Sequence, residues 1–220
     1  MIAPSSPALH ALDILTQVAD GHRPPPPAAP VVQALLDAER AAKHPRPALA
    51  LESLLGQWRL RFTAPNKPAY KAGEPVGKGF YWPGIFPGTI TFRPADPSPP
   101  RPPNPGASTP AHPSPQAASE PLSASALTIE NQIQFGPLAL RFSGPAKFLA
   151  KQNLLAFDFT QVQLFLGGWC PVKWPIKGRV GTEDFAQTPI AKLPFFAFFA
   201  ATDYYLAARG RGGGLALWAK

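Results

Sequence analysis

The stretch that decides the fold class of this 220-residue chain is Gly56-Gln57-Trp58-Arg59-Leu60-Arg61-Phe62-Thr63. Trp58, Leu60 and Phe62 alternate with polar residues along it. Successive side chains of a strand point to opposite faces of a sheet, so this alternation predicts a half-buried antiparallel strand. The three apolar side chains are expected together on the face that meets the core.

The same alternation returns at residues 127–135 and 138–142, with Gly136-Pro137 between them as a turn. At the end of the chain, residues 204–208 and 215–218 have the apolar character of paired strands around a run of glycines, as in a hairpin. Shorter strand candidates lie at residues 80–82, 88–93, 146–149, 154–159 and 162–166. Many short strands predict a mainly β fold, an antiparallel meander that curls or closes into a barrel.

Two short helices are expected before the sheet. Ser6-Pro7 is typical of a helix start, and apolar residues recur at helical spacing until Gly21. A second helical pattern begins at Val31 and ends before Pro45. We therefore divide the chain into a helical segment, residues 1–47, that packs on a barrel formed by residues 48–220. Within the barrel, the proline-rich residues 94–121 are predicted to be a disordered loop.

Composition limits the function classes. The net charge is +8, which suits an anionic membrane surface. The lone Cys170 forms no internal disulfide and fits a reducing compartment. The longest apolar run, residues 193–202, is shorter than the roughly 18 residues that span a bilayer, and the start lacks a signal-peptide pattern. We expect an intracellular protein, cytoplasmic or peripheral to a membrane. Residues 209–214 resemble a nucleic-acid element, but the flanking strands favour a hairpin turn, and no nucleic-acid partner is expected.

The sequence argues against catalysis. The four histidines lie in the front helices, their linkers or the proline-rich loop, so the predicted sheet contains none. No catalytic residue, metal site or cofactor is therefore expected. Carboxylates at Glu130, Asp158 and Asp203 leave an acid–base pair open, but strand carboxylates that point outward are the favoured interpretation.

A structural clamp is predicted at the first strand. Gly56 lets the chain enter the barrel closely, and the Trp58 indole fills that end. Arg209, from the last strands, is expected to lie over the Trp58 ring in a cation–π contact.

The order of these features resembles the plastid lipid-associated protein family, also called fibrillins, of plastids and cyanobacteria. The resemblance rests on the two front helices, residues 54–63 and 127–135, Leu193-Pro194-Phe195-Phe196 and the arginine-glycine ending, which is closest to cyanobacterial members. The proline-rich insertion departs from the family pattern. The resemblance implies a lipocalin-like barrel, peripheral association with thylakoids or lipid globules, and a role in holding carotenoids, quinones and other prenyl lipids for photoprotection.

The resulting hypothesis is a non-enzymatic binder of isoprenoid lipids. Its expected interior lining is Trp58, Leu60, Phe62, Ile129, Ile133, Phe142, Phe157, Phe195, Phe196, Phe198 and Phe199. Composition alone allows the same aromatic side chains simply to fill the barrel. The alternative is an interaction protein, without an internal ligand, that stabilises a prenylquinone-synthesis enzyme or a photosynthetic complex. A third possibility is a coat protein on lipid globules that uses the first helix and the basic strands.

Overall fold

The computed structural model describes residues 7–43, 48–65, 70–71, 74–75, 79–95, 125–176 and 185–220. Two helices, α1 (Pro7–Asp20) and α2 (Ala28–Ala41), precede the sheet. The strands are β1 (Gly56–Ala64), β2 (Tyr70–Lys71), β3 (Glu74–Pro75), β4 (Phe80–Tyr81), β5 (Gly88–Pro94), β6 (Ser125–Phe135), β7 (Leu138–Leu149), β8 (Leu154–Phe157), β9 (Gln161–Leu166), β10 (Trp169–Pro175), β11 (Phe195–Ala201), β12 (Tyr205–Gly210) and β13 (Leu215–Ala219). Short 3-10 turns lie at Leu51–Ser53, Ala150–Gln152 and Ile190–Lys192.

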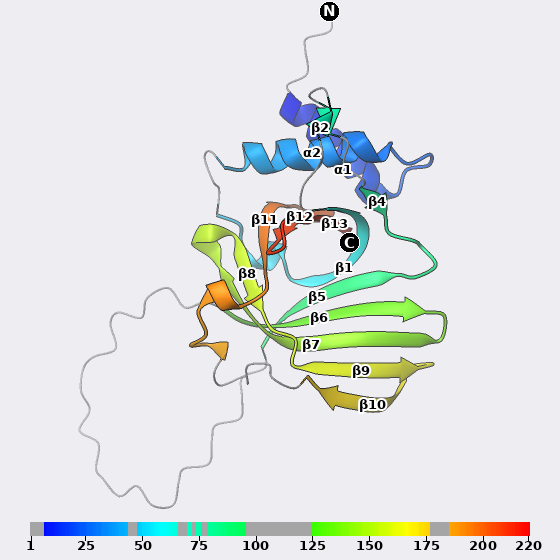
Figure 1. Ribbon diagram of the computed structural model, residues 1–220, viewed down its shortest axis with the longest axis vertical. Helices are drawn as coiled ribbons and strands as arrows, with labels where there is room; N and C mark the ends of the chain where they lie inside the picture. Colours follow the sequence, from blue (N-terminus) through cyan, green and yellow to red (C-terminus); the bar gives the residue numbers. More distant parts are fainter. Residues whose placement is uncertain are drawn as a thin grey trace, which may run out of the picture.

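Eight antiparallel strands close into a barrel in the order β1, β5, β6, β7, β8, β11, β12 and β13, with β13 returning to β1 (Figure 1). The mainly β, barrel-forming class predicted from the sequence is therefore confirmed, as are the two preceding helices. Closure leaves no free edge among these eight strands. β4 adds a short pairing to β1, and β2 and β3 form a separate pair.

Strand β7 divides the sheet. Its residues 146–149 pair with β8 as part of the barrel wall. Its residues 138–143 pair instead with β9, which in turn pairs with β10. We call β9, β10 and the halves of β6 and β7 beside them the wing, since they extend away from the barrel (Figure 1). Gly144 marks the branch, because a Cβ there would lie 1.9 Å from the carbonyl oxygen of Asp158.

The helices cover the outer face of one side of the barrel. Side chains at helical spacing, among them Leu15, Val31 and Leu35, are buried against β1, β12 and β13. The barrel offers them a flat apolar surface that includes Phe62 and Ala207. The helical layer is thus held by burial of its apolar faces, as amphipathic surface helices usually are.

Strands β1 and β11 each contain a β-bulge, and the bulge in β1 changes which face an aromatic side chain occupies. In β1 the register shifts between Leu60 and Phe62, so Trp58 and Leu60 face the interior whereas Phe62 packs under the helices. In β11, Phe199 alternates outward from Phe198 and packs against the helical cluster, and the register shift between Phe198 and Ala200 leaves Ala200 on the same outer face. The expectation that Phe62 shares a face with Trp58 is therefore wrong, because a bulge reverses the alternation.

The strands differ from the sequence prediction, most of all at β7, β10 and β11; β2 and β3 were also not predicted, and β8 ends at Phe157 rather than at residue 159. Residues 138–142 and 146–149 form one continuous strand, β7, and β10 and β11 were not among the predicted strands. Most of the predicted proline-rich loop lies outside the described residues. Neither α1 nor α2 is long and apolar enough to cross a bilayer, and the same holds for every helix in the described part of the chain.

Candidate functional site

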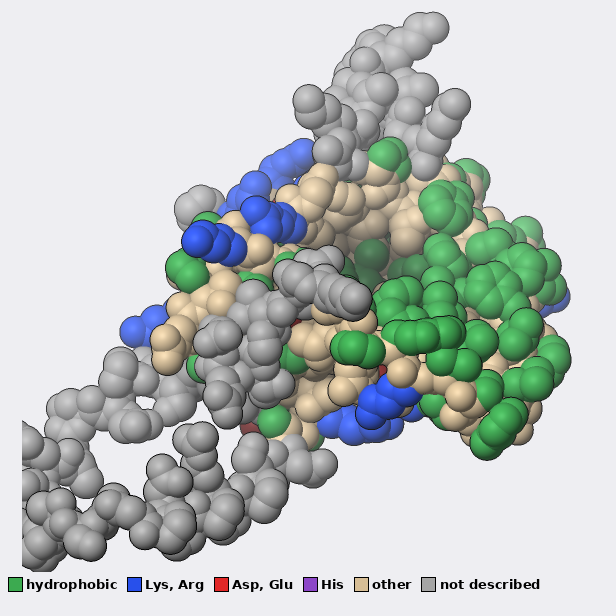
Figure 2. All heavy atoms as spheres, turned by 60° about the horizontal axis from the view of Figure 1, so that its bottom comes forward, with side chains coloured by type: hydrophobic (Ala, Val, Ile, Leu, Met, Phe, Trp, Pro, Cys, Tyr) green, Lys and Arg blue, Asp and Glu red, His purple; other side chains and the backbone are tan. Residues whose placement is uncertain are grey.

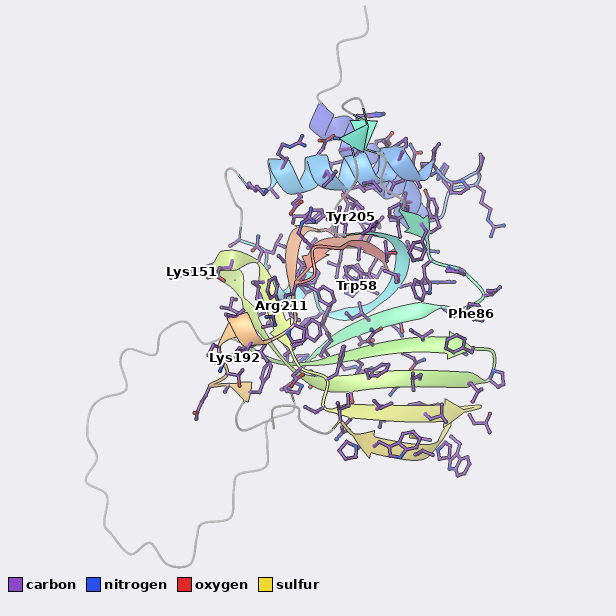
Figure 3. The ribbon with its side chains drawn as sticks, viewed as in Figure 1. Trp58, Phe86, Lys151, Lys192, Tyr205 and Arg211 are labelled. Carbon is purple, nitrogen blue, oxygen red and sulfur yellow. The ribbon has the colours of Figure 1, made fainter. Side chains whose placement is uncertain are left out.

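One end of the barrel is filled with aromatic side chains. Trp58 is fully buried there, and its indole Nε1 donates a hydrogen bond of 2.8 Å to the Leu54 carbonyl (Figure 3). The rings of Phe92 and Phe198 meet edge to face at 6.1 Å, and those of Phe157 and Phe196 stack at 5.0 Å. This half of the interior is a packed core.

The other part of the interior is hollow. A pocket of about 250 Å³ opens between β1, β5, β6, β11 and β13. Its lining is mostly apolar and consists of Leu60, Thr63, Trp82, Gly88, Thr89, Ile90, Asn131, Ile133, Phe196, Ala216 and Trp218. The barrel therefore combines a filled end with an apolar cavity, which is the usual character of a small-molecule site.

Two polar side chains face this apolar cavity. Thr63 lines it, and among the described residues the Thr63 hydroxyl is buried with no hydrogen-bond partner. Asn131 lines it from β6. A buried hydroxyl without a partner costs stability, commonly about 1–3 kcal/mol. A ligand oxygen placed against Thr63 would recover that cost.

Trp82 forms one wall at the rim. Its indole Nε1 donates to the Phe86 carbonyl at 2.5 Å, which fixes the ring over the turn that follows. Gly88 makes this position possible, because a Cβ there would lie 3.1 Å from the same indole nitrogen. The Trp82 ring, packed against the backbone of Gly88, thus forms the rim of the pocket.

Most residues predicted to line the interior do lie at or near it. Six belong to the interior cluster, namely Trp58, Leu60, Ile129, Phe157, Phe196 and Phe198. Leu60, Ile133 and Phe196 line the pocket. Phe142 lies 5.9 Å from the Phe159 ring, where the wing meets the barrel.

Three predicted lining residues face outward. Phe62 and Phe199 pack in the cluster formed with the helices, and Phe195 packs in a small outer cluster with Ala156, Phe185 and Leu193. Their proposed place in a ligand cavity is therefore corrected. The bulge in β1 accounts for Phe62. Phe199 faces outward by simple alternation from the inward-facing Phe198. Phe195 precedes the second bulge and alternates outward from Phe196.

The predicted clamp is also rearranged. Arg209 does not lie over Trp58 but forms a two-pronged ion pair with Glu39 of α2, through Nε at 2.7 Å and Nη2 at 2.5 Å, and it also donates to the Gly213 carbonyl. Lys220 takes the position over the Trp58 ring, with Nζ 5.2 Å from its centroid. Gly56 has a φ of +111°, a conformation that suits glycine.

The Arg209 hydrogen bond lowers the pKa of the Glu39 carboxyl below its ordinary value of 4.5, and burial opposes that shift only in part. Arg209 is therefore a clamp between barrel and helices. It does not support the pocket directly.

The strand carboxylates occupy different environments. Glu130 pairs with Arg93 at 3.3 Å on the outer face of the sheet, and Asp203 is exposed in the turn before β12. Asp158, which was expected to point outward, is buried at the branch of β7, where its amide donates to the Pro145 carbonyl at 3.0 Å. Within the described residues, no three His, Cys, Asp or Glu side chains gather as a metal site would require.

Sequence reasoning missed several pocket residues, chiefly Thr63, Trp82 and Trp218. Asn131 carried a usable signal, since it is the single polar residue on the apolar face of residues 127–135. Thr63 carried none, because the bulge that turns it inward has no sequence mark that we recognise.

Comparisons with family models, with curated proteins and with solved structures find no match to this chain.

Proposed function

We propose that this protein is a fibrillin-type, non-enzymatic binder of an isoprenoid lipid, a quinone or a carotenoid, at a thylakoid or lipid-globule surface, and that it contributes to photoprotection. The observation that carries the proposal is the apolar pocket, which the Thr63 hydroxyl faces without a hydrogen-bond partner among the described residues. The resemblance of the sequence supplies the lipid class and the location. A lipocalin-like barrel that holds such a lipid in its open end is consistent with the pocket and with the resemblance.

The pocket volume limits what lies inside. At about 250 Å³ it is smaller than the roughly 300–1,000 Å³ of sites that enclose a whole drug-sized ligand. A single ring head group fits this volume, whereas a complete prenyl lipid does not. The proposed ligand therefore places its ring in the pocket and its chain outside.

The wing offers an apolar path for that chain. Cross-strand neighbours share a face of a sheet, and Ile133 of the pocket is paired with Leu140, which is paired with Leu164, which is paired with Val172. This row leads from the pocket across the wing. The opposite face carries Gln132, Arg141, Gln163 and Lys173 in the same register.

The ring would be oriented by hydrogen bonds. A quinone carbonyl or a carotenoid ring hydroxyl accepts a hydrogen bond from the Thr63 hydroxyl, and Asn131 offers both a donor and an acceptor nearby. A purely hydrocarbon ligand would leave Thr63 unpaired. We therefore expect oxygenated rings to bind more tightly than unsubstituted ones.

The alternative function, a scaffold without internal ligand, predicts a filled barrel. The filled end agrees with it, but the pocket beside Thr63 favours ligand binding. An exposed apolar surface, which the scaffold function also predicts, is present on the wing and is treated below.

The test is a titration with short-chain benzoquinones, followed by quenching of tryptophan fluorescence, since Trp82 and Trp218 line the pocket. We expect Thr63→Val to weaken binding about two- to tenfold, the value of one hydrogen bond, while the melting temperature of the free protein stays the same or rises. Thr128→Val, on the outer face of β6, is the matched control and should bind normally. Equal affinity of wild type and Thr63→Val would contradict the proposed orientation, and absence of saturable binding would contradict the proposed function.

A further inference from the structure

Three turns at one end of the molecule expose large apolar side chains. They are the approach to β5 (residues 82–87), the β6–β7 turn (residues 135–138) and the β9–β10 turn (residues 166–169), and together we call them the apolar tip. Its exposed side chains are Ile85, Phe86, Phe135, Leu138, Leu166 and Trp169. Ile85 is 75% exposed and Trp169 is 68% exposed. Figure 2 shows hydrophobic side chains gathered over this end of the molecule.

The three turns are joined into one rigid unit. The Gly167 amide donates to the Pro137 carbonyl at 2.8 Å, which ties the β9–β10 turn to the β6–β7 turn. The Gln134 amide donates to the Pro87 carbonyl at 3.0 Å, and the rings of Phe86 and Phe135 lie 5.1 Å apart. The apolar tip is therefore held by the sheet, and its side chains need little further ordering on binding.

Charge is distributed as a bilayer surface requires. Residues 82–91, 134–140 and 164–172 contain no charged side chain. Cations stand just behind them: Arg59 donates to the Gly84 carbonyl at 3.4 Å, and Arg141 lies over the Phe165 ring at 4.5 Å. If the uncharged turns enter the apolar layer of a bilayer, the arginines behind them lie at the level of the anionic headgroups. Each basic residue there contributes about 1 kcal/mol to membrane binding.

A second copy of the chain fits this surface less well. β10 is the outer strand of the wing, and it contains Pro171 and Pro175, which cannot donate to an added strand. Joining two wings by their edges is thereby disfavoured. An exposed tryptophan in an apolar turn, such as Trp169, is instead typical of membrane interfaces.

We propose that the apolar tip inserts into the interfacial layer of a lipid bilayer with anionic headgroups. Insertion does not depend on a ligand in the pocket. The inference rests on the membrane-surface part of the proposed function and deepens it by naming the residues that contact the bilayer. It also places the pocket rim at the bilayer, because Trp82 belongs to both the rim and the apolar tip, and Ile133 lies two residues before Phe135. A lipid could then pass from the bilayer into the pocket without crossing water, a consequence that does rest on the proposed function.

The test is cosedimentation of the full chain with phosphatidylcholine vesicles that contain or lack phosphatidylglycerol. We expect binding to the anionic vesicles, weaker binding to the neutral ones, and at least a tenfold loss in the double variant Ile85→Asp/Trp169→Asp. Two controls carry matched changes elsewhere: Tyr204→Asp, at 67% exposure in the turn before β12, and Leu9→Asp, at 62% exposure on α1. Both should bind like wild type. Because all four positions are exposed, unchanged thermal melting should accompany each substitution.

Three results would overturn the proposal: no binding of wild type to anionic vesicles, unaltered binding of the tip variant, or a loss confined to Leu9→Asp, which would assign insertion to the first helix. The same variants are titrated with a short-chain benzoquinone in vesicle-free buffer. Quinone binding that survives while vesicle binding is absent would reject the inserting tip and leave the ligand-binding part of the proposed function intact. The converse result would reject the ligand and leave the tip.

Discussion

Replacing Arg209 by alanine removes the ion pair that joins the helices to the barrel. Both side chains are mostly shielded, with Arg209 25% and Glu39 19% exposed. Exposed pairs contribute about 0–1 kcal/mol, and breaking a fully buried pair costs about 3–5 kcal/mol. This pair lies between those limits, so we expect the free energy of unfolding to fall by about 2 kcal/mol. For a chain of this size the melting temperature should fall by about 4–8 °C.

The assay is urea denaturation of wild type, Arg209→Ala, Glu39→Ala and the double variant. The double-mutant cycle isolates the pairwise energy from the additional Arg209 bond to Gly213. Arg40→Ala is the control, because Arg40 pairs with Asp37 on the same helix but is 68% exposed, and it should cost less than about 0.5 kcal/mol. A coupling energy indistinguishable from zero, or a loss for Arg209→Ala no larger than for Arg40→Ala, would refute the reasoning.

Three further predictions concern the same framework. The pKa of the Glu39 carboxyl is lowered on folding, so the ionised carboxylate contributes its full stabilisation of the folded state above pH 4.5, its ordinary pKa, and this stabilisation is lost as the pH falls through the lowered pKa of the folded state. In urea denaturation at decreasing pH, wild type should therefore lose more stability than Glu39→Gln, and equal losses would contradict this role of Glu39. Gly144→Ala would force a Cβ to within 1.9 Å of the Asp158 carbonyl oxygen, so we expect a loss of more than about 3 kcal/mol in urea denaturation, and wild-type stability would contradict the branch geometry. Phe62→Ala should cost about 3–5 kcal/mol of stability, yet folded protein should bind a quinone with unchanged affinity, since Phe62 lies under the helices; weaker binding in a titration would place it in the pocket after all.

The sequence predicted those parts of the fold in which one face is buried and the other is solvated. Strand β1 up to Leu60 and most of β6 show clean alternation, and α1 and α2 show helical spacing. β11 escaped prediction because both of its faces are covered, the inner by the barrel and the outer by the helices, so it reads as a continuous apolar run. β10 escaped because prolines interrupt it, as an outer strand tolerates.

The candidate site was predictable only in part, because it depends on long-range geometry. The bulge in β1 turns Phe62 outward and Thr63 inward, and no residue pattern signals it. Arg209 was expected over the Trp58 ring but pairs with Glu39, which lies on a helix whose position over the barrel could not be derived from spacing. The wing arises from the branch of β7 at Gly144, where the sequence suggested only a break between two strands.

The measurement that tests the central claim most directly is to purify the protein from a photosynthetic host without detergent, extract it with organic solvent, and identify the extracted molecules by mass spectrometry. Our account predicts a prenylquinone or an oxygenated carotenoid at close to one molecule per chain, and clearly less of it in Thr63→Val purified in parallel. A folded protein that carries no apolar molecule would contradict the proposed function, and the search would then turn to a protein partner.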